Sequence, residues 1–141
     1  MQTLFEDSDL TITYDSDHDW LLTAWRGRRS PEASMHYCWL LLEKIRATGS
    51  TCVLNDSSQD LDGWSEVTRW LGQDFFLRLT SNGISAVAWV LPLDLRARAD
   101  VNQVMAQVGT NWPAVDTFTD VEAAYAWLLR TTAPRAGKIN C

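Results

Sequence analysis

The chain begins with two segments in which the residue pattern favours strands. Leu10 to Tyr14 alternates apolar and polar residues, and Trp20 to Trp25 is rich in residues that favour β-structure. An Asp-, Ser- and His-containing turn separates them. Alternation with a period of two is typical of a strand with one buried face. The two segments predict an N-terminal β-hairpin.

A helical period follows the hairpin. Apolar residues recur at intervals of three and four positions, which places them on one face of a helix; they are Met35, Cys38, Trp39, Leu42 and Ile45. Ser30 is a favourable N-cap, Pro31 suits the first helical position, and Gly49 suits the residue after the last turn. The pattern predicts a helix between Ser30 and Gly49.

Strand and helix patterns then alternate to near the end of the chain. They are a strand at Thr51–Leu54, a helix from Trp64 to Leu79, a strand at Ile84–Leu91, a helix around Val101–Val108, a strand at Val115–Phe118 and a helix from Val121. This order predicts an α/β fold with a mixed, mainly parallel sheet of about five strands and four helices. We expect one domain over residues 1–130, and a disordered tail over residues 131–141, where periodicity is lost.

Composition narrows the class of protein. The chain is 46% hydrophobic and carries a net charge of −6, with an isoelectric point near 4.7. A nucleic-acid partner is not expected, because such binding depends on basic residues that displace counterions. The three cysteines have no framework spacing, and no signal peptide or membrane-spanning segment is recognisable. We therefore expect a cytoplasmic protein that does not insert into a membrane.

One polar segment lies where α/β proteins often bind ligands. Asn55–Asp62 follows a predicted strand and precedes a predicted helix, beyond the carboxyl end of that strand. Asp56, Ser57 and Ser58 are the candidate residues, because a hydroxyl near a helix N-terminus is a favourable place for an added phosphate. The alternative interpretation is an ordinary polar connection in which Asp62 caps the helix.

Other candidate chemistry is weaker. Arg26, Arg28 and Arg29 precede the first helix and either bind an anion there or form a solvated turn. The His and Cys residues lack the spacing of metal ligands, and the acidic segment lacks the glycine and glutamate of a calcium loop. Nucleotide-binding and catalytic motifs are missing from the sequence. We expect no metal, no cofactor and no enzymatic activity.

Eight tryptophans are many for a chain of 141 residues. Trp64, Trp70 and Trp89 are candidates to line a pocket for a small apolar or lipid-like ligand, and the alternative is packing in the core. An exposed aromatic patch would instead indicate a homodimer, because contiguous apolar surface commonly marks an interface.

The layout, together with residues 25–32 (WRGRRSPE), 53–56 (VLND) and 88–90 (AWV), resembles a small bacterial group related to STAS domains. These are the domains of anti-sigma-factor antagonists, and the lipid-binding SEC14 fold is related to them. The resemblance covers about residues 4 to 130. It implies a regulatory module that is not an enzyme, with a protein partner and a serine, here Ser57 after Asp56, that a partner kinase phosphorylates. The segment from Ser58 to Gly63 is an insertion relative to that pattern.

Overall fold

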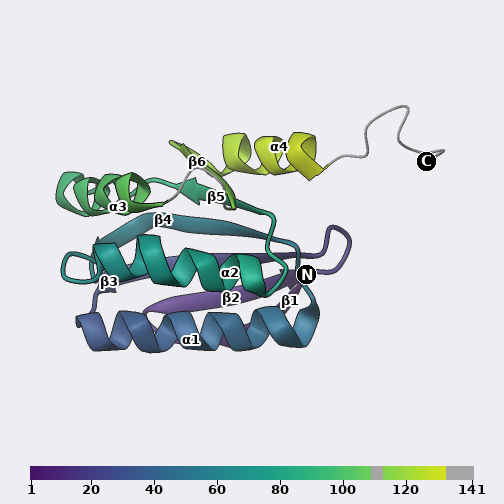
Figure 1. The fold of residues 1–141 in the computed structure, drawn as a ribbon, viewed down its shortest axis with the longest axis horizontal. Helices are drawn as coiled ribbons and strands as arrows, with labels where there is room; N and C mark the ends of the chain where they lie inside the picture. The colour runs from purple at the N-terminus through teal and green to yellow at the C-terminus, as the bar shows by residue number, and fades with distance from the viewer. Residues whose placement is uncertain (109–112, 133–141) are drawn as a thin grey trace.

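The computed structural model describes residues 1–108 and 113–132 (Figure 1). The strands are β1 (Gln2–Glu6), β2 (Leu10–Asp15), β3 (Trp20–Arg28), β4 (Cys52–Asp62), β5 (Ala86–Val90) and β6 (Ala114–Phe118). The helices are α1 (Pro31–Thr48), the π-helical turn η1 (Trp70–Phe75), α2 (Phe76–Ser81), α3 (Leu95–Gln107) and α4 (Val121–Thr132). Within the described ranges, no helix combines the length and apolar character needed to cross a lipid bilayer.

The six strands form one sheet in which every strand pairs with the next strand along the chain. β1 pairs with β2 and β2 with β3 in antiparallel orientation, and the remaining pairs are parallel. This confirms the expected α/β class with an N-terminal hairpin and a mixed, mainly parallel sheet. The sheet has one strand more than expected, because β1 was not predicted. Of the expected tail, residues 131 and 132 belong to α4, and residues 133–141 lie outside the described ranges.

The helices form two unequal layers on the sheet. Buried residues of α1, of the segment from Trp64 to Leu79 and of α3 share one apolar cluster with one face of the sheet. α4 packs on the second face, over β4, β5 and β6. A strictly right-handed crossover places successive helices on the same face when strands are added in one direction. The order β3-β4-β5-β6 therefore accounts for the three helical segments on one face, whereas α4, which follows the last strand, packs on the other.

The predicted ends of α1 are confirmed. The Ser30 hydroxyl accepts a hydrogen bond from the Ala33 amide (3.1 Å), and Pro31 occupies the first helical position. Gly49 adopts the left-handed conformation (φ 68°), in which its N–H donates to the Ile45 carbonyl (2.8 Å). These contacts set the direction in which α1 leaves β3, close to the polar end of β4.

The second helical segment is wider than an ordinary α-helix in its middle. The chain becomes helical at Thr68, passes through η1 and ends as α2. A side chain at Gly72 would place its Cβ 2.5 Å from Cβ of Gln107 and 2.7 Å from the Val104 carbonyl oxygen. η1 is therefore packed directly against the end of α3, and only glycine permits that approach.

Candidate functional site

The polar segment that was expected to be a loop is a strand. β4 runs through to Asp62, and its register pairs Gln59 with Arg26 and Asp60 with Gly27 on β3. β5 accompanies β4 only as far as Asp56. Beyond that point the other side of β4 meets the chain after β5, where the Leu93 amide donates to the Ser58 carbonyl (3.2 Å). The expectation of a loop was wrong, because the polar side chains find buried partners.

Two polar side chains of β4, those of Asn55 and Ser57, have their partners on the neighbouring strands β3 and β5. The Asn55 Oδ1 accepts hydrogen bonds from the Thr23 hydroxyl and from the Trp25 indole N–H, both at 2.6 Å. The Ser57 hydroxyl, which is fully buried, accepts from the Trp89 indole N–H at 2.7 Å. In the described ranges every buried side-chain nitrogen and oxygen has a hydrogen-bond partner. Burial of polar groups is tolerated on this condition.

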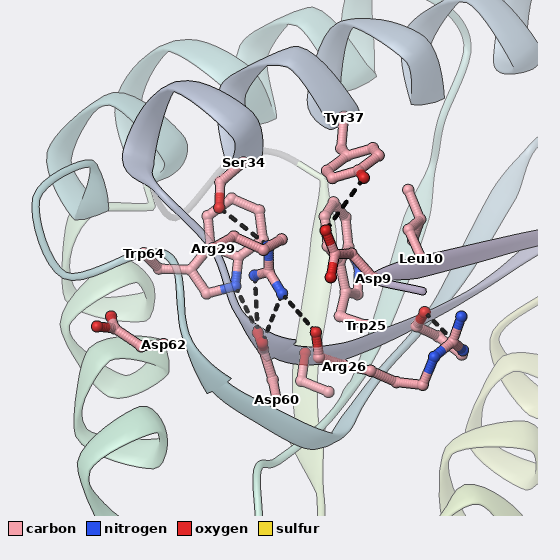
Figure 2. A network of polar contacts seen from close by, with 12 residues as sticks. Asp9, Leu10, Trp25, Arg26, Arg29, Ser34, Tyr37, Asp60, Asp62 and Trp64 are labelled. Atoms are coloured by element: carbon pink, nitrogen blue, oxygen red, sulfur yellow. Dashed lines mark hydrogen bonds and ion pairs between the residues drawn. The ribbon is translucent and has the colours of Figure 1, made fainter. Parts of the chain in front are cut away.

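A buried ion pair joins the residue that follows β3, Arg29, to Asp60 near the end of β4 (Figure 2). Arg29 Nη1 donates to Asp60 Oδ1 at 2.7 Å and Nη2 donates to Oδ2 at 3.1 Å, which is a bidentate pair. The two side chains are 0% and 1% exposed. Trp64 donates its indole N–H to the same carboxylate (2.9 Å), and Arg29 Nε donates to the Ser34 hydroxyl on α1 (3.1 Å).

Aromatic rings enclose the guanidinium on two sides. Its central carbon lies 5.0 Å from the ring centre of Trp25 and 5.2 Å from that of Trp64, within the range of a cation–π contact. A Cβ at Gly63 would lie 2.4 Å from Arg29 Nη2. The Arg29–Asp60 pair therefore joins β3, β4, α1 and the start of the second helical segment. The guanidinium occupies the space between the two indole rings and Gly63.

A second polar cluster ties α1 to the turn between β1 and β2. The Tyr37 hydroxyl donates to Asp7 Oδ2 (2.5 Å). It also lies 3.2 Å from Asp9 Oδ2 (Figure 2). The hydrogen bond to Asp7, together with burial, raises the pKa of Tyr37. Burial alone would raise the pKa of Asp7, but hydrogen bonds from Tyr37 and from backbone amides hold that pKa below its usual value. The cluster therefore has a structural role, which is to hold α1 against the β1–β2 turn.

The three arginines proposed to bind an anion point to different places. Arg29 is held inside by Asp60, and Arg26 donates to the carbonyls of Asp7 and Ser8 and to the Thr11 hydroxyl. Arg28 is exposed. The structure does not gather their charges around one position at the start of α1.

The three residues proposed for phosphorylation or partner binding also differ. Asp56 and Ser58 are half-buried, with the Ser58 amide donating to Asp56 Oδ1 (2.9 Å). The Ser57 hydroxyl faces Trp89 in the interior. The strand, and not a helix N-terminus, presents all three, because the chain becomes helical only at Thr68. Of the two serines, only Ser58 is partly exposed to solvent in this fold.

The tryptophans proposed to line a pocket are packed in the core or on its border. Trp64 and Trp89 are buried, and with Trp25 they line a cavity of about 20 Å³. That volume holds about one water molecule, whereas small-molecule pockets span ~300 Å³ or more. Trp70 does not reach the cavity and stacks on Phe75. The cavity volume gives the ligand-binding interpretation no support.

Three exposed leucines lie at the carboxyl edge of the sheet and were not singled out from the sequence. Leu61 on β4 is 37% exposed, Leu93 after β5 is 65% exposed, and Leu95 at the start of α3 is 77% exposed. We call these three residues the leucine edge. Leu93 and Leu95 flank Asp94, whose side chain caps α3 by accepting from the Ala97 amide (3.0 Å). The sequence signal that could have indicated this surface is the pair of leucines on either side of the helix-capping Asp94, just after the strand that ends at Val90.

A scan against models of known protein families matches none of them, and a search of curated proteins finds no match. Among the described residues, no three or more His, Cys, Asp and Glu side chains are grouped so that they could hold a metal ion.

Proposed function

We propose that the protein is a regulatory or interaction module that binds a protein partner at the leucine edge. The observation that carries the proposal is the exposure of Leu61, Leu93 and Leu95 at the carboxyl ends of the parallel strands. Ligands and partners of open α/β sheets commonly occupy that end. Contiguous exposed apolar surface commonly marks a binding site, so the proposal takes the three leucines as parts of one contact with the partner.

The rigidity of the surroundings supports the same surface. Leu61 is next to Asp60, so the buried Arg29–Asp60 pair fixes the backbone that presents it. The hydrogen bond from the Leu93 amide to the Ser58 carbonyl joins the second segment to the first. A surface that is ordered before binding loses less conformational entropy on association, which favours affinity.

Regulation is proposed through Ser58. The resemblance to STAS-type antagonists suggests a phosphorylated serine near the carboxyl end of this strand, and Ser57 is buried against Trp89. A phosphate on Ser58 would add about 1.5 to 2 negative charges beside the leucines and would weaken an apolar contact there. The proposal thus assigns partner binding to the leucine edge and partner release to Ser58, whose carbonyl is bonded to the Leu93 amide.

The experiment compares two variants in cross-linked pull-downs from the native cells, read by quantitative mass spectrometry. Leu93→Asp/Leu95→Asp charges the leucine edge, and Leu77→Asp charges an equally apolar position on α2 that is 55% exposed. We expect the partner to be lost with the double variant and retained with Leu77→Asp. Recovery of the same proteins by the wild type and the double variant would contradict the proposal. Ser58→Glu is expected to reduce recovery of the partner, and unchanged recovery would remove the regulatory part.

A further inference from the structure

The outer side of α1 carries an exposed tryptophan. The Trp39 side chain is 42% exposed, whereas Trp20, Trp25, Trp64 and Trp89 are between 1% and 4% exposed. A large aromatic side chain that stays in contact with water forgoes much of the free energy that its burial would release. Tryptophans of this kind are enriched at the centres of protein interfaces.

Contacts within the chain hold the Trp39 ring in one orientation. The guanidinium carbon of Arg78 on α2 lies over the ring, 4.8 Å from its centre. The ring centre of Trp70 on η1 lies 6.0 Å away, with the two rings inclined at 60°. The exposed part of the indole is therefore ordered before any association, and an ordered side chain loses little conformational entropy on binding.

Charged residues line up with Trp39 along the same side of the helix. Spacings of four and three positions place residues on one face, and the residues so placed are all exposed: Glu32, His36, Trp39, Glu43 and Arg46. We call these five residues the Trp39 stripe. It spans 14 positions, or roughly 21 Å. α1 itself lies along an outer side of the molecule (Figure 1).

The Trp39 stripe is complementary to itself when two copies of α1 lie antiparallel. A two-fold axis at Trp39 sets each position opposite the one at equal separation on the other side of Trp39. Glu32 and Arg46 are both seven positions from Trp39, so each faces the other across the axis. His36 and Glu43 are three and four positions away, which leaves an offset of roughly 1.5 Å along the helix. Both pairs join groups that attract, and the symmetry forms each pair twice.

The net charge of the chain does not oppose this contact. α1 contains two acidic and two basic residues, whereas the first 25 residues of the chain contain six acidic residues and no Lys or Arg. The excess negative charge therefore belongs to the N-terminal hairpin. Arg46 Nε donates to Asn82 Oδ1 (2.9 Å), which fixes one basic end of the stripe. Charge complementarity thus selects a second copy of the chain as the occupant of this surface.

We propose that two copies of the chain associate through the Trp39 stripe, with their α1 helices antiparallel about a two-fold axis. The two indoles meet at the centre, and the Glu32–Arg46 and His36–Glu43 pairs close the contact on either side. The surface is built from other residues than the leucine edge, and it does not depend on the function proposed there.

The test measures the dissociation constant of the dimer by sedimentation velocity over a concentration series. We expect Trp39→Ala, Glu32→Arg and Arg46→Glu each to weaken the dimer at least about tenfold, or 1.4 kcal/mol. Glu122→Arg and Arg130→Glu are matched controls, because they reverse the same charges in the first and last turns of α4. They should change the dissociation constant less than about twofold. Circular dichroism checks that every variant is folded.

Mixing two variants separates an interface from an effect within one helix. In a mixed dimer of Glu32→Arg with Arg46→Glu, the two substituted charges face each other with opposite signs, and so do the two native ones. We therefore expect the mixture to form a heterodimer within about threefold of the wild-type affinity. Loss of a favourable helix-dipole interaction, which each variant also suffers, would not be restored by mixing.

Several results would overturn the proposal. They are a wild type that stays monomeric over the whole series, an unchanged dissociation constant in Trp39→Ala, equal weakening in the α4 controls, and a mixture that does not recover. The Leu93→Asp/Leu95→Asp variant should dimerise as the wild type does. A dimer lost in that variant would instead place the second copy on the leucine edge, so failure here and failure of the leucine-edge proposal are distinguishable.

Discussion

The two halves of β4 are one continuous strand held in place by different interactions. Cys52–Leu54 lies between β3 and β5, is apolar and is buried on both faces of the sheet. Asn55–Asp62 is polar, outlasts β5 and relies on side-chain partners for Asn55, Ser57 and Asp60. The first half is stabilised by removal of apolar surface from water, and the second by hydrogen bonds and charge pairing inside the protein.

The comparison shows how differently the two halves respond to change. An apolar half-strand tolerates substitution in proportion to the volume removed. A buried polar half-strand depends on every partner being present, because one orphaned group loses its solvation without compensation. A register shift of one residue would turn Ser57 and Asp60 away from their partners, so these residues also fix how β4 is aligned with β3.

The largest effect is expected where a charge would be left unpaired in the polar half. Asp60→Ala leaves the Arg29 guanidinium buried without its carboxylate, and loss of one partner of a buried pair costs about 3–5 kcal/mol of the free energy of unfolding. Urea unfolding measures it. Asp56→Ala is the control on the same strand, where we expect a loss below about 1 kcal/mol. Similar losses in the two variants would show that the pair does not hold the strand.

A somewhat smaller effect is expected in the apolar half. Leu54→Ala removes a side chain that is 2% exposed, and such truncations cost about 2–5 kcal/mol according to how far the cavity collapses. Leu61→Ala, at an exposed position of the polar half, should stay within about 0.5 kcal/mol of the wild type. Equal midpoints of urea denaturation for Leu54→Ala and Leu61→Ala would contradict the assignment of the two environments.

The serine pair separates buried from accessible hydroxyls. Ser57→Ala leaves the Trp89 indole N–H without its acceptor, which costs about 1–3 kcal/mol. Ser58→Ala should cost less than about 0.5 kcal/mol, since its side chain is half-buried and its backbone carbonyl keeps the bond from Leu93. A thermal unfolding series of the two variants measures the difference. A reversed order would mean that Ser57 is the exposed residue.

The smallest effect concerns Asp100 on α3, which faces the polar half of β4. Burial raises the pKa of Asp100, and the carboxylates of Asp62 and Asp60 add to this although Arg96 opposes it. A raised carboxyl pKa means that the folded state binds the proton more tightly, so this residue lowers stability as pH rises from about 4 towards neutrality. Asp100→Asn should therefore gain thermal stability over the wild type at pH 7 and lose that advantage near pH 4. A difference independent of pH would argue against the carboxylate crowding.

Much of the fold could be predicted because local patterns determine it. The hairpin, the ends of α1 at Ser30 and Gly49, and the alternation of later strands and helices follow from periodicity and capping. β1 was missed because it is an edge strand with a register irregularity between Thr3 and Phe5 and little buried surface. An edge strand carries a weak hydrophobic pattern.

The candidate site was less predictable because its contacts are distant in sequence. Asp60 lies 31 residues after Arg29, and Trp89 lies 32 residues after Ser57. The residues around Ser57 and Asp60 give no indication of those partners. Their polar composition is that of a loop, so the sequence alone favours a loop over a strand. Of three neighbouring arginines, Arg29 is the one that turns inward: its amide donates to the Asp62 carbonyl at the end of β4 (2.9 Å), and its guanidinium pairs with Asp60.

The central claim is that the polar half of β4 is a fixed strand held by the Arg29–Asp60 pair. Native-state hydrogen exchange of the amides from Gln59 to Asp62, compared between the wild type and Asp60→Asn, tests it most directly. The account predicts that the amides paired to β3 exchange at least about 100-fold more slowly than in an unstructured chain, and that this protection falls in Asp60→Asn while Val53 and Leu54 stay protected. Exchange at loop rates in the wild type, or equal protection in the two proteins, would contradict it.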